Sequence, residues 1–413
     1  MKTIVSVTPL QVTADSRTFK IAASFSRFGY RSIVIEGEKS KVDQADLPFE
    51  IGAGGDFLAT KDSTVSSSAG SNQLGYSGLK LRLKKWVKRQ PCLVQRLLMT
   101  LIGPPYYVNN YVLRPIKEIP IASLYYLHAP YQFPAAYWWS RRSTAPIIYD
   151  AHDFYPVLSP NVFYSRKIEA WCIRESAAVV TVSDGVARLM RQEFGCEPVI
   201  LRNCEDMRLN STPKQDLRET LGLSRDVFLI VLVGQAKSGQ AIPEALQALS
   251  GLEPFIHFVF VGKNTENYRD MVVRSGLQAR VHFVPPVKPT EVVPFIKSAD
   301  ASLILYFSKD VDYENALPNK FFQAVSAELP LLYPELPEIK KLAVQYGLGI
   351  PVDTKSPDSI KSGILRLVQK RDVFDTLKKN LRIAKKTLSW EQEEVILYDL
   401  VRGIIGESPS VAS

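Results

Sequence analysis

The sequence has few of the features that build metal centres, disulfide frameworks or membrane spans. Its four cysteines show no C-x-x-C spacing and have no histidine pair nearby, so neither a zinc site nor a disulfide framework is expected. No window approaches 18 uninterrupted apolar residues, and the apolar run at the N-terminus is too short for a secretory signal. These absences predict a cytoplasmic protein without a membrane-spanning helix.

Acidic residues are missing from a long stretch of the first half. Residues 63–117 contain nine basic residues and no acidic one, and since the whole chain carries a net charge of +9, the remainder is balanced. Within residues 79–101 apolar residues recur at helical spacing, which predicts a basic amphipathic helix. Such a helix with an interfacial tryptophan is typical of membrane-surface elements. The predicted membrane contacts are Lys80, Lys84, Lys85, Trp86, Lys88 and Arg89.

Two other interpretations of this basic stretch stay open. A run of positive charge also attracts nucleic acid, and a solvated cationic helix that packs on its own domain through its leucines would show the same pattern. We favour an anionic membrane surface, and therefore a peripheral position on the inner face of the plasma membrane without a nucleic-acid partner.

The length of 413 residues fits two domains, each large enough for its own hydrophobic core. Short apolar runs alternate with helical patterns along the whole chain, which predicts parallel sheets with crossover helices. The expected fold class is therefore α/β, with two doubly wound, Rossmann-like domains. We place an N-terminal domain at residues 1–207, a C-terminal domain at 208–388, and a last helix at 389–405 that crosses back to the first domain.

The most informative segment spans residues 311–339, VDYENALPNKFFQAVSAELPLLYPELPEI. Pro318 is well placed to open a helix, because its fixed φ suits the first turn and its missing N–H would have no partner there. The next free backbone N–H groups, with Lys320 beside them, would point at whatever precedes the helix. Such a helix start is an anion site, so the loop is predicted to hold a phosphate.

This segment resembles the C-terminal signature of retaining glycosyltransferase family 4, a GT-B group that includes bacterial exopolysaccharide and lipopolysaccharide enzymes. The family usually has two glutamates eight residues apart, one near the donor sugar and one at the ribose; here they are Asn315 and Gln323. In the loop after residue 233, Gln235 stands where an arginine is common. The resemblance therefore implies weakened donor binding. The implied nucleotide-sugar contacts are Gly234, Lys237, Lys263, Asn315, Leu317, Pro318, Asn319, Lys320 and Gln323.

In the first half, YDAHDFYP resembles a family segment whose histidine reaches the donor sugar, which makes His152 the candidate catalytic residue. Asp150 and Asp153 flank it, and a neighbouring carboxylate favours an imidazolium. A histidine that merely caps a strand end is the alternative. The implied acceptor-side residues are Asp15, Arg17, His128 and Asp153, and Asp15 could also serve simply as a helix cap. His257 and His282 lie within expected strands and are assigned to the core or a sheet face.

The resemblance implies a hexosyltransferase, in which two domains face a central cleft and the nucleotide diphosphate leaves from a nucleotide-sugar donor. It implies a lipid-linked glycan acceptor in bacterial surface polysaccharide synthesis, and no cofactor or bound metal. Two alternatives stay open. The chain could be a degenerate, non-catalytic partner protein, or a GT-B sugar-nucleotide epimerase.

Overall fold

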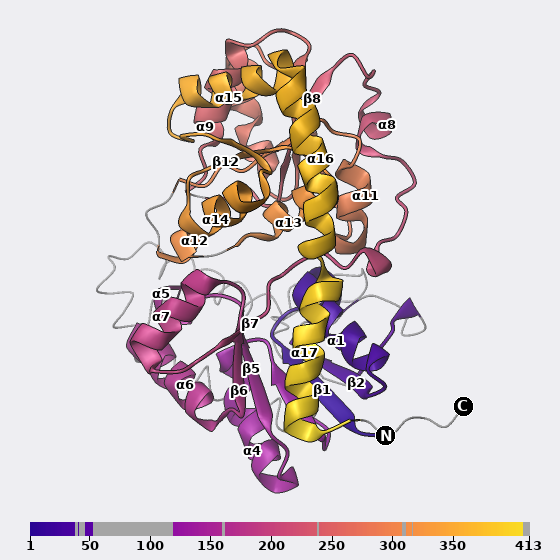
Figure 1. Ribbon diagram of the computed structural model, residues 1–413, viewed down its shortest axis with the longest axis vertical. Coiled ribbons are helices and arrows are strands. Elements are labelled where there is room, and N and C mark those ends of the chain that lie inside the picture. Colours follow the sequence, from indigo (N-terminus) through magenta and orange to yellow (C-terminus); the bar gives the residue numbers. More distant parts are fainter. Residues whose placement is uncertain are drawn as a thin grey trace, which may run out of the picture. The chain divides into compact units, whose positions relative to one another are not determined.

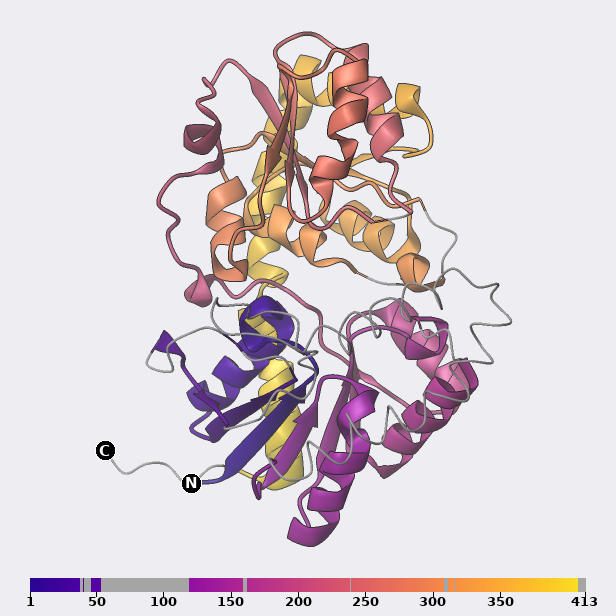
Figure 2. The same cartoon turned by 180° about the vertical axis from the view of Figure 1, so that it is seen from behind.

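The computed structural model describes residues 1–37, 40, 46–52, 119–158, 162–237, 239–307, 311–315 and 317–407. They belong to two compact units. The first unit comprises Met1–Thr181, Met190–Val199 and Leu400–Ser413, and the second comprises Val182–Leu189 and Ile200–Asp399. Figures 1 and 2 show each unit as a sheet with helices packed against it.

The sheet of the first unit has the order β3-β2-β1-β4-β5-β6-β7 within the described part of the chain, and the pairs from β3 to β6 are parallel. Its central strands are buried along almost their whole length, which agrees with their mainly apolar sequences. The strands are β1 (Thr3–Thr8), β2 (Arg31–Glu36), β3 (Glu50–Ile51), β4 (Leu124–Leu127), β5 (Ile147–Ala151), β6 (Ala178–Thr181) and β7 (Val199–Ile200).

Helix α1 packs on β1 and β2, α4 on β4 and β5, and α6 on β5. Helix α1 begins at Ser16, where the Asp15 carboxylate caps it by accepting from the backbone N–H groups of Arg17 and Thr18. The helices of the first unit are η1 (Val12–Ala14), α1 (Ser16–Arg27), η5 (Pro130–Gln132), α4 (Phe133–Ser143), α5 (Tyr155–Leu158) and α6 (Val162–Glu175), and α7 (Asp184–Phe194) begins in the second unit and ends in the first.

The sheet of the second unit is parallel throughout its described strands, in the order β10-β9-β8-β11-β12-β13. Its two faces carry separate apolar clusters, and successive residues of β8 alternate between them: Leu229 and Val231 belong to one, Ile230 and Leu232 to the other. The strands are β8 (Phe228–Val233), β9 (Ile256–Val261), β10 (Val281–Val284), β11 (Ala301–Leu303), β12 (Leu331–Tyr333) and β13 (Gly349–Pro351).

Helices cover both faces of this second sheet, since both apolar clusters include helix residues. They are η6 (Met207–Leu209), α8 (Leu217–Leu221), α9 (Ile242–Ser250), η7 (Thr265–Tyr268), α10 (Arg269–Arg274), η8 (Pro289–Glu291), α11 (Val292–Ile296), α12 (Val311–Asn315), α13 (Asn319–Ser326), α14 (Pro337–Tyr346), α15 (Pro357–Gln369), α16 (Arg371–Thr387) and α17 (Trp390–Ile405), the last of which ends in the first unit. Trp390 at the start of α17 is fully buried, and its backbone N–H donates to the Glu205 carbonyl.

The predicted fold class is confirmed: the chain is α/β with two Rossmann-like domains. One local detail differs from the prediction, since Pro318 has an extended backbone and precedes α13 as its N-cap instead of lying in the first turn. The cleft expected between the domains stays a prediction. Strand order reverses between β1 and β4, and again between β8 and β11. Ligands of open parallel sheets bind at the carboxyl ends of strands at such reversal points.

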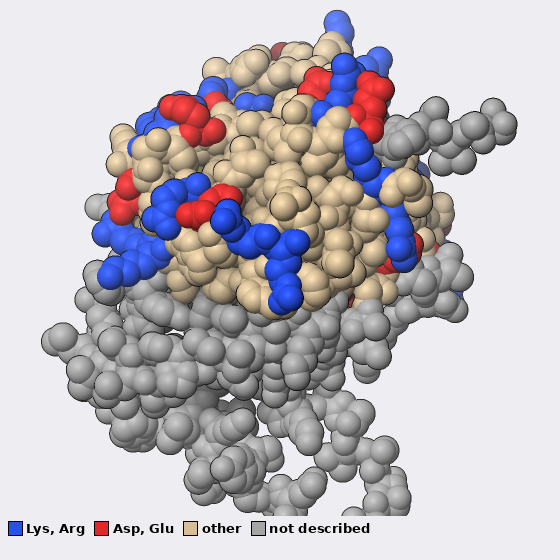
Figure 3. All heavy atoms as spheres, turned by 90° about the horizontal axis from the view of Figure 1, so that it is seen from below, with Lys and Arg blue, Asp and Glu red and all other residues tan. Residues whose placement is uncertain are grey.

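Within the described residues, no helix is both long and apolar enough to cross a membrane. The face seen from below in Figure 3 carries Lys and Arg side chains around a broad uncharged area, with fewer Asp and Glu side chains among them. The predicted membrane contacts, Lys80 to Arg89, lie outside the described residues.

Candidate functional site

The carboxyl ends of β4 and β5 bring a group of polar residues together in the first unit. His128 directly follows β4, whereas Asp150 lies within β5 and His152 just after it. Because β4 and β5 are paired in parallel, with Leu127 opposite Tyr149, these side chains reach the same edge of the sheet. We call Arg17, Tyr126, His128, Asp150 and His152 the histidine cluster.

A buried ion pair supports the histidine cluster. The Arg17 guanidinium donates through Nε to Asp150 Oδ2 and through a terminal nitrogen to Oδ1, both at 2.8 Å. The Arg17 side chain is 2% exposed and the Asp150 side chain is fully buried. Tyr126 donates its hydroxyl to Asp150 Oδ2 at 3.2 Å. Two parallel bonds fix the planes of both groups, so the carboxylate is held in one orientation.

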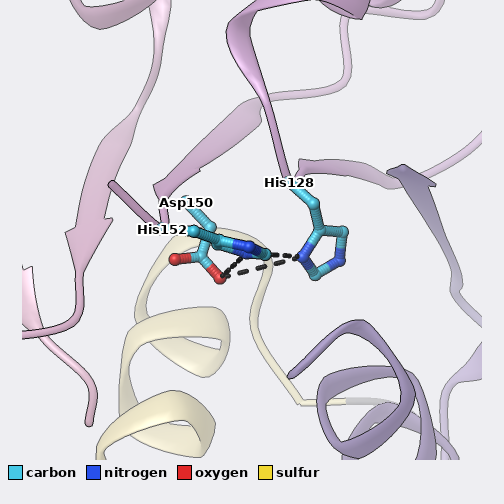
Figure 4. A group of neighbouring side chains, drawn as sticks. All are labelled: His128, Asp150 and His152. Atoms are coloured by element: carbon cyan, nitrogen blue, oxygen red, sulfur yellow. Dashed lines mark hydrogen bonds and ion pairs between the residues drawn. The ribbon is translucent and has the colours of Figure 1, made fainter. Parts of the chain in front are cut away.

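The two histidines converge on this carboxylate (Figure 4). His152 Nε2 lies 3.4 Å from Asp150 Oδ2 and 3.2 Å from His128 Nδ1, and His128 Nδ1 lies 3.8 Å from the same oxygen. His128 is buried, whereas the His152 side chain is 20% exposed. His152 is therefore the member of the pair that a bound molecule can reach.

The surroundings push the two imidazoles toward opposite protonation states. Burial, and next the charge of His152, lowers the pKa of His128 to about 3. Burial also opposes charge on His152, but the charge and hydrogen bond of Asp150 raise its pKa above the ordinary value. Burial alone would raise the pKa of Asp150, yet Arg17 and then His152 hold it well below its usual range. At neutral pH the cluster therefore favours neutral His128 and ionised Asp150, and Asp150 shifts His152 toward its protonated form.

The spacing of these three side chains could also suit a metal ion. Zinc–nitrogen bonds of about 2.0–2.1 Å put neighbouring ligand atoms of a tetrahedron roughly 3.3 Å apart, close to the separations in the cluster. However, both Asp150 oxygens already accept from Arg17, and this guanidinium places a fixed positive charge against the same carboxylate. That charge favours a proton over a divalent cation between Asp150 and His152. The expectation that the protein requires no metal stays a prediction.

In the second unit, two glycines bring strand ends close together. Gly234 follows β8 with φ +112°, and Gly262 follows β9 so tightly that a Cβ there would lie 2.0 Å from the Gly234 carbonyl oxygen. Neither position tolerates a side chain, so no side chain of these two residues covers the backbone at the carboxyl end of the sheet. A small pocket lies here, lined among others by Gly234, Ala236, Gln240, Thr265 and Lys320. We call it the Gly234 pocket.

Lys320 provides the positive charge of the Gly234 pocket. It occupies the first turn of α13, and a Cβ at Gly234 would lie 3.5 Å from its Nζ. Throughout the described ranges, no carboxylate pairs with this ammonium. Burial, and next the positive charge of Lys237, lowers the pKa of Lys320 to about 8. A partly buried cation that has no counter-ion among the described residues, beside the N–H groups of a helix start, is an arrangement that favours an anion.

The other residues predicted around α13 differ in what their side chains do. Gln323 lies one turn after Lys320, is half-buried, and has no side-chain hydrogen bond within the described part of the chain. Leu317 packs in the apolar core. Asn319 accepts from Asn203 Nδ2 at 2.6 Å, and Pro318 caps α13. No described residue therefore occupies the Gln323 side chain, which leaves it available to a ligand.

Asn315 is held on both sides by other parts of the second unit. Its Nδ2 donates to the Val311 carbonyl at 2.7 Å, and its Oδ1 accepts from Arg188 at 3.2 Å. The Ser183 hydroxyl donates to the Asn315 carbonyl, and a Cβ on Gly185 would lie 2.8 Å from that same oxygen. Asn315 therefore ties α12 to the start of α7.

The remaining predicted residues lie at the expected strand and loop ends. Lys237 and Lys263 are exposed, and the Lys263 carbonyl accepts from the backbone N–H of Ala236 at 2.9 Å. Asp153 follows His152, and its charge, after burial, raises the pKa of Tyr155. His257 and His282 lie on neighbouring strands and share a hydrogen bond of 3.1 Å, in agreement with their assignment to a sheet face.

Sequence reasoning missed several residues of these sites. Tyr126 lies on β4, two residues before His128, which directly follows the strand, so the period of two could have placed both on one side. Tyr306, whose ring lies under Lys320, follows β11 in an irregular segment without a periodic pattern. Arg188 comes from a distant part of the sequence, and no local signal links it to Asn315.

Two family models match the chain. Residues 94–204 match the model described as Glycosyltransferase Family 4, and residues 213–387 match Glycosyl transferases group 1. No curated protein matches the sequence.

Solved structures share the fold at low sequence identity. HepE from Anabaena in complex with UDP-glucose superposes with a TM-score of 0.69 at 14% identity, covering 98% of this chain and 100% of its own. Sucrose-phosphate synthase from Thermosynechococcus elongatus gives 0.67 at 14% identity, with 99% and 100% covered. WaaG, a glycosyltransferase involved in lipopolysaccharide biosynthesis, gives 0.59 at 13% identity, with 97% and 100% covered.

Proposed function

The chain carries the two domains of a GT-B glycosyltransferase, and we propose that it transfers a hexose, with retention, from a nucleotide-diphosphate sugar to a membrane-linked glycan. The proposed pathway is bacterial surface polysaccharide synthesis, on the inner face of the plasma membrane. The proposal includes no metal requirement. The observation that carries it is Lys320, a cation at a helix start in the Gly234 pocket that pairs with no carboxylate of the described residues.

Transfer of the sugar requires that the leaving nucleotide diphosphate is stabilised. Negative charge develops on the nucleotide diphosphate as the glycosidic bond breaks, and fixed donors in a pocket of low dielectric stabilise it without reorganisation. Lys320 and the first N–H groups of α13 supply such donors, with Lys237 as a second cation. HepE has been crystallised with UDP and with UDP-glucose, which supports a nucleotide sugar as the donor here.

His152 is the proposed contact to the donor sugar. It is the exposed member of the histidine cluster, and Asp150 favours its protonated form. An imidazolium held by a buried carboxylate donates a charge-assisted hydrogen bond to a sugar hydroxyl. Arg17 and Asp150 act behind it as positioning residues.

A degenerate, non-catalytic relative is the second candidate function. Three positions where the resembled family has charged residues are the amides Gln235, Asn315 and Gln323, and both ends of the Asn315 amide are already occupied by protein groups. Incubation with labelled UDP- and GDP-sugars and membrane extract separates the candidates. Label transferred to lipid supports the enzyme, binding without turnover supports the degenerate partner, and an isomerised nucleotide sugar would indicate an epimerase.

Gln323→Glu should keep the affinity for UDP or raise it up to about tenfold. Gln323 has no side-chain partner in the described ranges, and a carboxylate accepts charge-assisted bonds from ribose hydroxyls that are worth about 1.5–3 kcal/mol each in a buried site. Isothermal titration calorimetry measures this, with Gln247→Glu on the exposed side of α9 as a matched control. Loss of affinity in Gln323→Glu alone would show a pocket built around the neutral amide.

The membrane contact of residues 80–89 rests on the sequence, because these residues lie outside the described ranges. Reversing Lys84, Lys85 and Lys88 to Glu should release the protein from anionic vesicles, since each basic residue near such a surface contributes about 1 kcal/mol. Vesicle sedimentation at rising salt measures this, because charge attraction is screened over about 8 Å at physiological ionic strength. UDP affinity should not change.

The matched control reverses three exposed lysines of the second unit, Lys370, Lys379 and Lys386, and so introduces the same change in net charge. Equal loss of vesicle binding in both triple variants would show that the effect depends on the net charge of the protein and not on the position of the lysines. Equal partition of the wild type onto neutral and anionic vesicles would contradict a basic docking helix.

A further inference from the structure

Two stacked tyrosines lie next to the cation of the Gly234 pocket. Tyr306 follows β11 and Tyr313 belongs to α12, and their rings stack with centroids 4.7 Å apart at 22°. Lys320 Nζ lies 4.6 Å from the centroid of the Tyr306 ring. The face of an aromatic ring attracts an ammonium at this distance.

The backbone of Tyr306 is fixed from both sides. It forms an antiparallel bridge with Gln240, in the segment that leads from Gly234 into α9, and its carbonyl accepts from the Thr354 hydroxyl at 3.0 Å. The flanking Leu305 carbonyl accepts from the backbone N–H of Ala241 at 2.9 Å. Tyr306 is therefore anchored to the loop that lines the Gly234 pocket, and Tyr313 covers its ring.

The Tyr306 ring is the one attractive contact of the Lys320 ammonium that the described residues provide. The other charged group acting on it, Lys237, repels it. We propose that Tyr306 is a positioning residue, whose ring face holds the Lys320 ammonium over Gly234, ready for the diphosphate of a nucleotide sugar. This inference rests on the proposed function and adds a residue that lies outside the sequence motif at residues 311–339.

The ring also has an electrostatic consequence. Burial and Lys237 both disfavour the charged form of Lys320, whereas the negative face of the ring favours it. Without the ring, less of the lysine is charged near neutral pH and its stem can leave the pocket. Both effects weaken binding of a dianion and leave an uncharged ligand unaffected.

The alternative role for Tyr306 is direct stacking on the base or the sugar. Uridine and UDP separate the two, because uridine has the base and ribose but no diphosphate. Tyr306→Leu removes the ring face at similar volume, whereas Tyr306→Phe keeps it. We expect Tyr306→Leu to weaken UDP binding about three- to tenfold, and Tyr306→Phe to restore affinity to within about twofold of the wild type.

The coupling to Lys320 is measured with a double-mutant cycle. In a Lys320→Met background, Tyr306→Leu should change UDP affinity by less than about twofold, because the ring then has no cation to hold. Uridine affinity should be the same in all four proteins. Thermal melts of each variant show that the fold is kept.

Three results would overturn the inference. An unchanged UDP affinity in folded Tyr306→Leu would show that the ring does not hold Lys320. An equal loss of affinity for uridine and UDP would assign Tyr306 to stacking on the base or sugar. If Tyr306→Leu weakened UDP binding as much in the Lys320→Met background as in the wild type, Tyr306 would act independently of Lys320. If wild-type protein binds neither UDP nor GDP, the proposed function fails first and this inference with it.

Discussion

Replacing Arg17 by methionine should lower the free energy of unfolding by about 3–5 kcal/mol at neutral pH, because it leaves the Asp150 carboxylate buried without its partner. Urea denaturation followed by tryptophan fluorescence measures the loss. As the pH falls, the loss should shrink. Despite burial, Arg17 and then His152 hold the pKa of wild-type Asp150 well below its unfolded value, so the stabilisation is present near neutral pH and is lost as the pH falls.

The chain offers a matched control for this variant. Arg31 and Glu50 form a bidentate pair of nearly the same geometry, with contacts of 2.8 and 2.7 Å, but both side chains are 49% exposed. Arg31→Met should cost at most about 1 kcal/mol, because solvent screens exposed pairs. Equal losses in the two variants would contradict the role of burial in the Arg17 effect.

The double variant Arg17→Met/Asp150→Asn tests the cause directly. It removes both charges while the amide still accepts from Tyr126, so it should be more stable than Arg17→Met alone. If the double variant is as unstable as the single one, the lost packing of the Arg17 stem, and not the buried charge, sets the cost. The same proteins report on the site, since a shifted His152 titration by NMR would follow from loss of the ionised carboxylate.

The order of strands and helices could be predicted because each element depends mainly on the pattern of its own local sequence. Strands such as β8 and β9 are buried along almost their whole length, so each is a largely apolar run between turns, interrupted in β9 by His257. The ends of two such strands carried His128 and His152, and the rule that ligands meet the carboxyl ends of parallel strands was enough to place both histidines at one edge. The parallel pairing of β4 with β5 then brings them together.

The partners of these residues could not be predicted in the same way. Arg17 and Asp150 are 133 positions apart in the sequence, and no periodic pattern couples a helix start to a strand interior at that distance. The sequence interpretation gave Arg17 an acceptor-side role from the resemblance, which stays a prediction. In the structure its guanidinium donates to both carboxylate oxygens of Asp150. Tyr306 follows β11 and Tyr313 belongs to α12, and no local sequence pattern predicts that their rings stack.

Lys320→Ala should weaken UDP binding about 10- to 100-fold at pH 7, since a charge-assisted contact to a phosphate is worth roughly 1.5–3 kcal/mol. Calorimetry measures it, with Lys379→Ala on the exposed side of α16 as the matched control. The free energy of unfolding should not fall, because Lys320 has no counter-ion in the described ranges and burial already disfavours its charge. A loss of affinity with intact folding would therefore reflect the ligand contact alone.

The pH dependence of UDP binding provides the independent test of Lys320. Its pKa in the free protein is lowered to about 8, so the ammonium is charged at pH 7 and largely neutral at pH 9. Above pH 8, binding of the diphosphate must take up a proton, and the dissociation constant of the wild type should rise by up to about tenfold per pH unit. Lys320→Ala should show no such rise between pH 7 and 9, because no group at this position then takes up a proton. A parallel rise in both proteins would assign the titration to another group and remove Lys320 from the phosphate site.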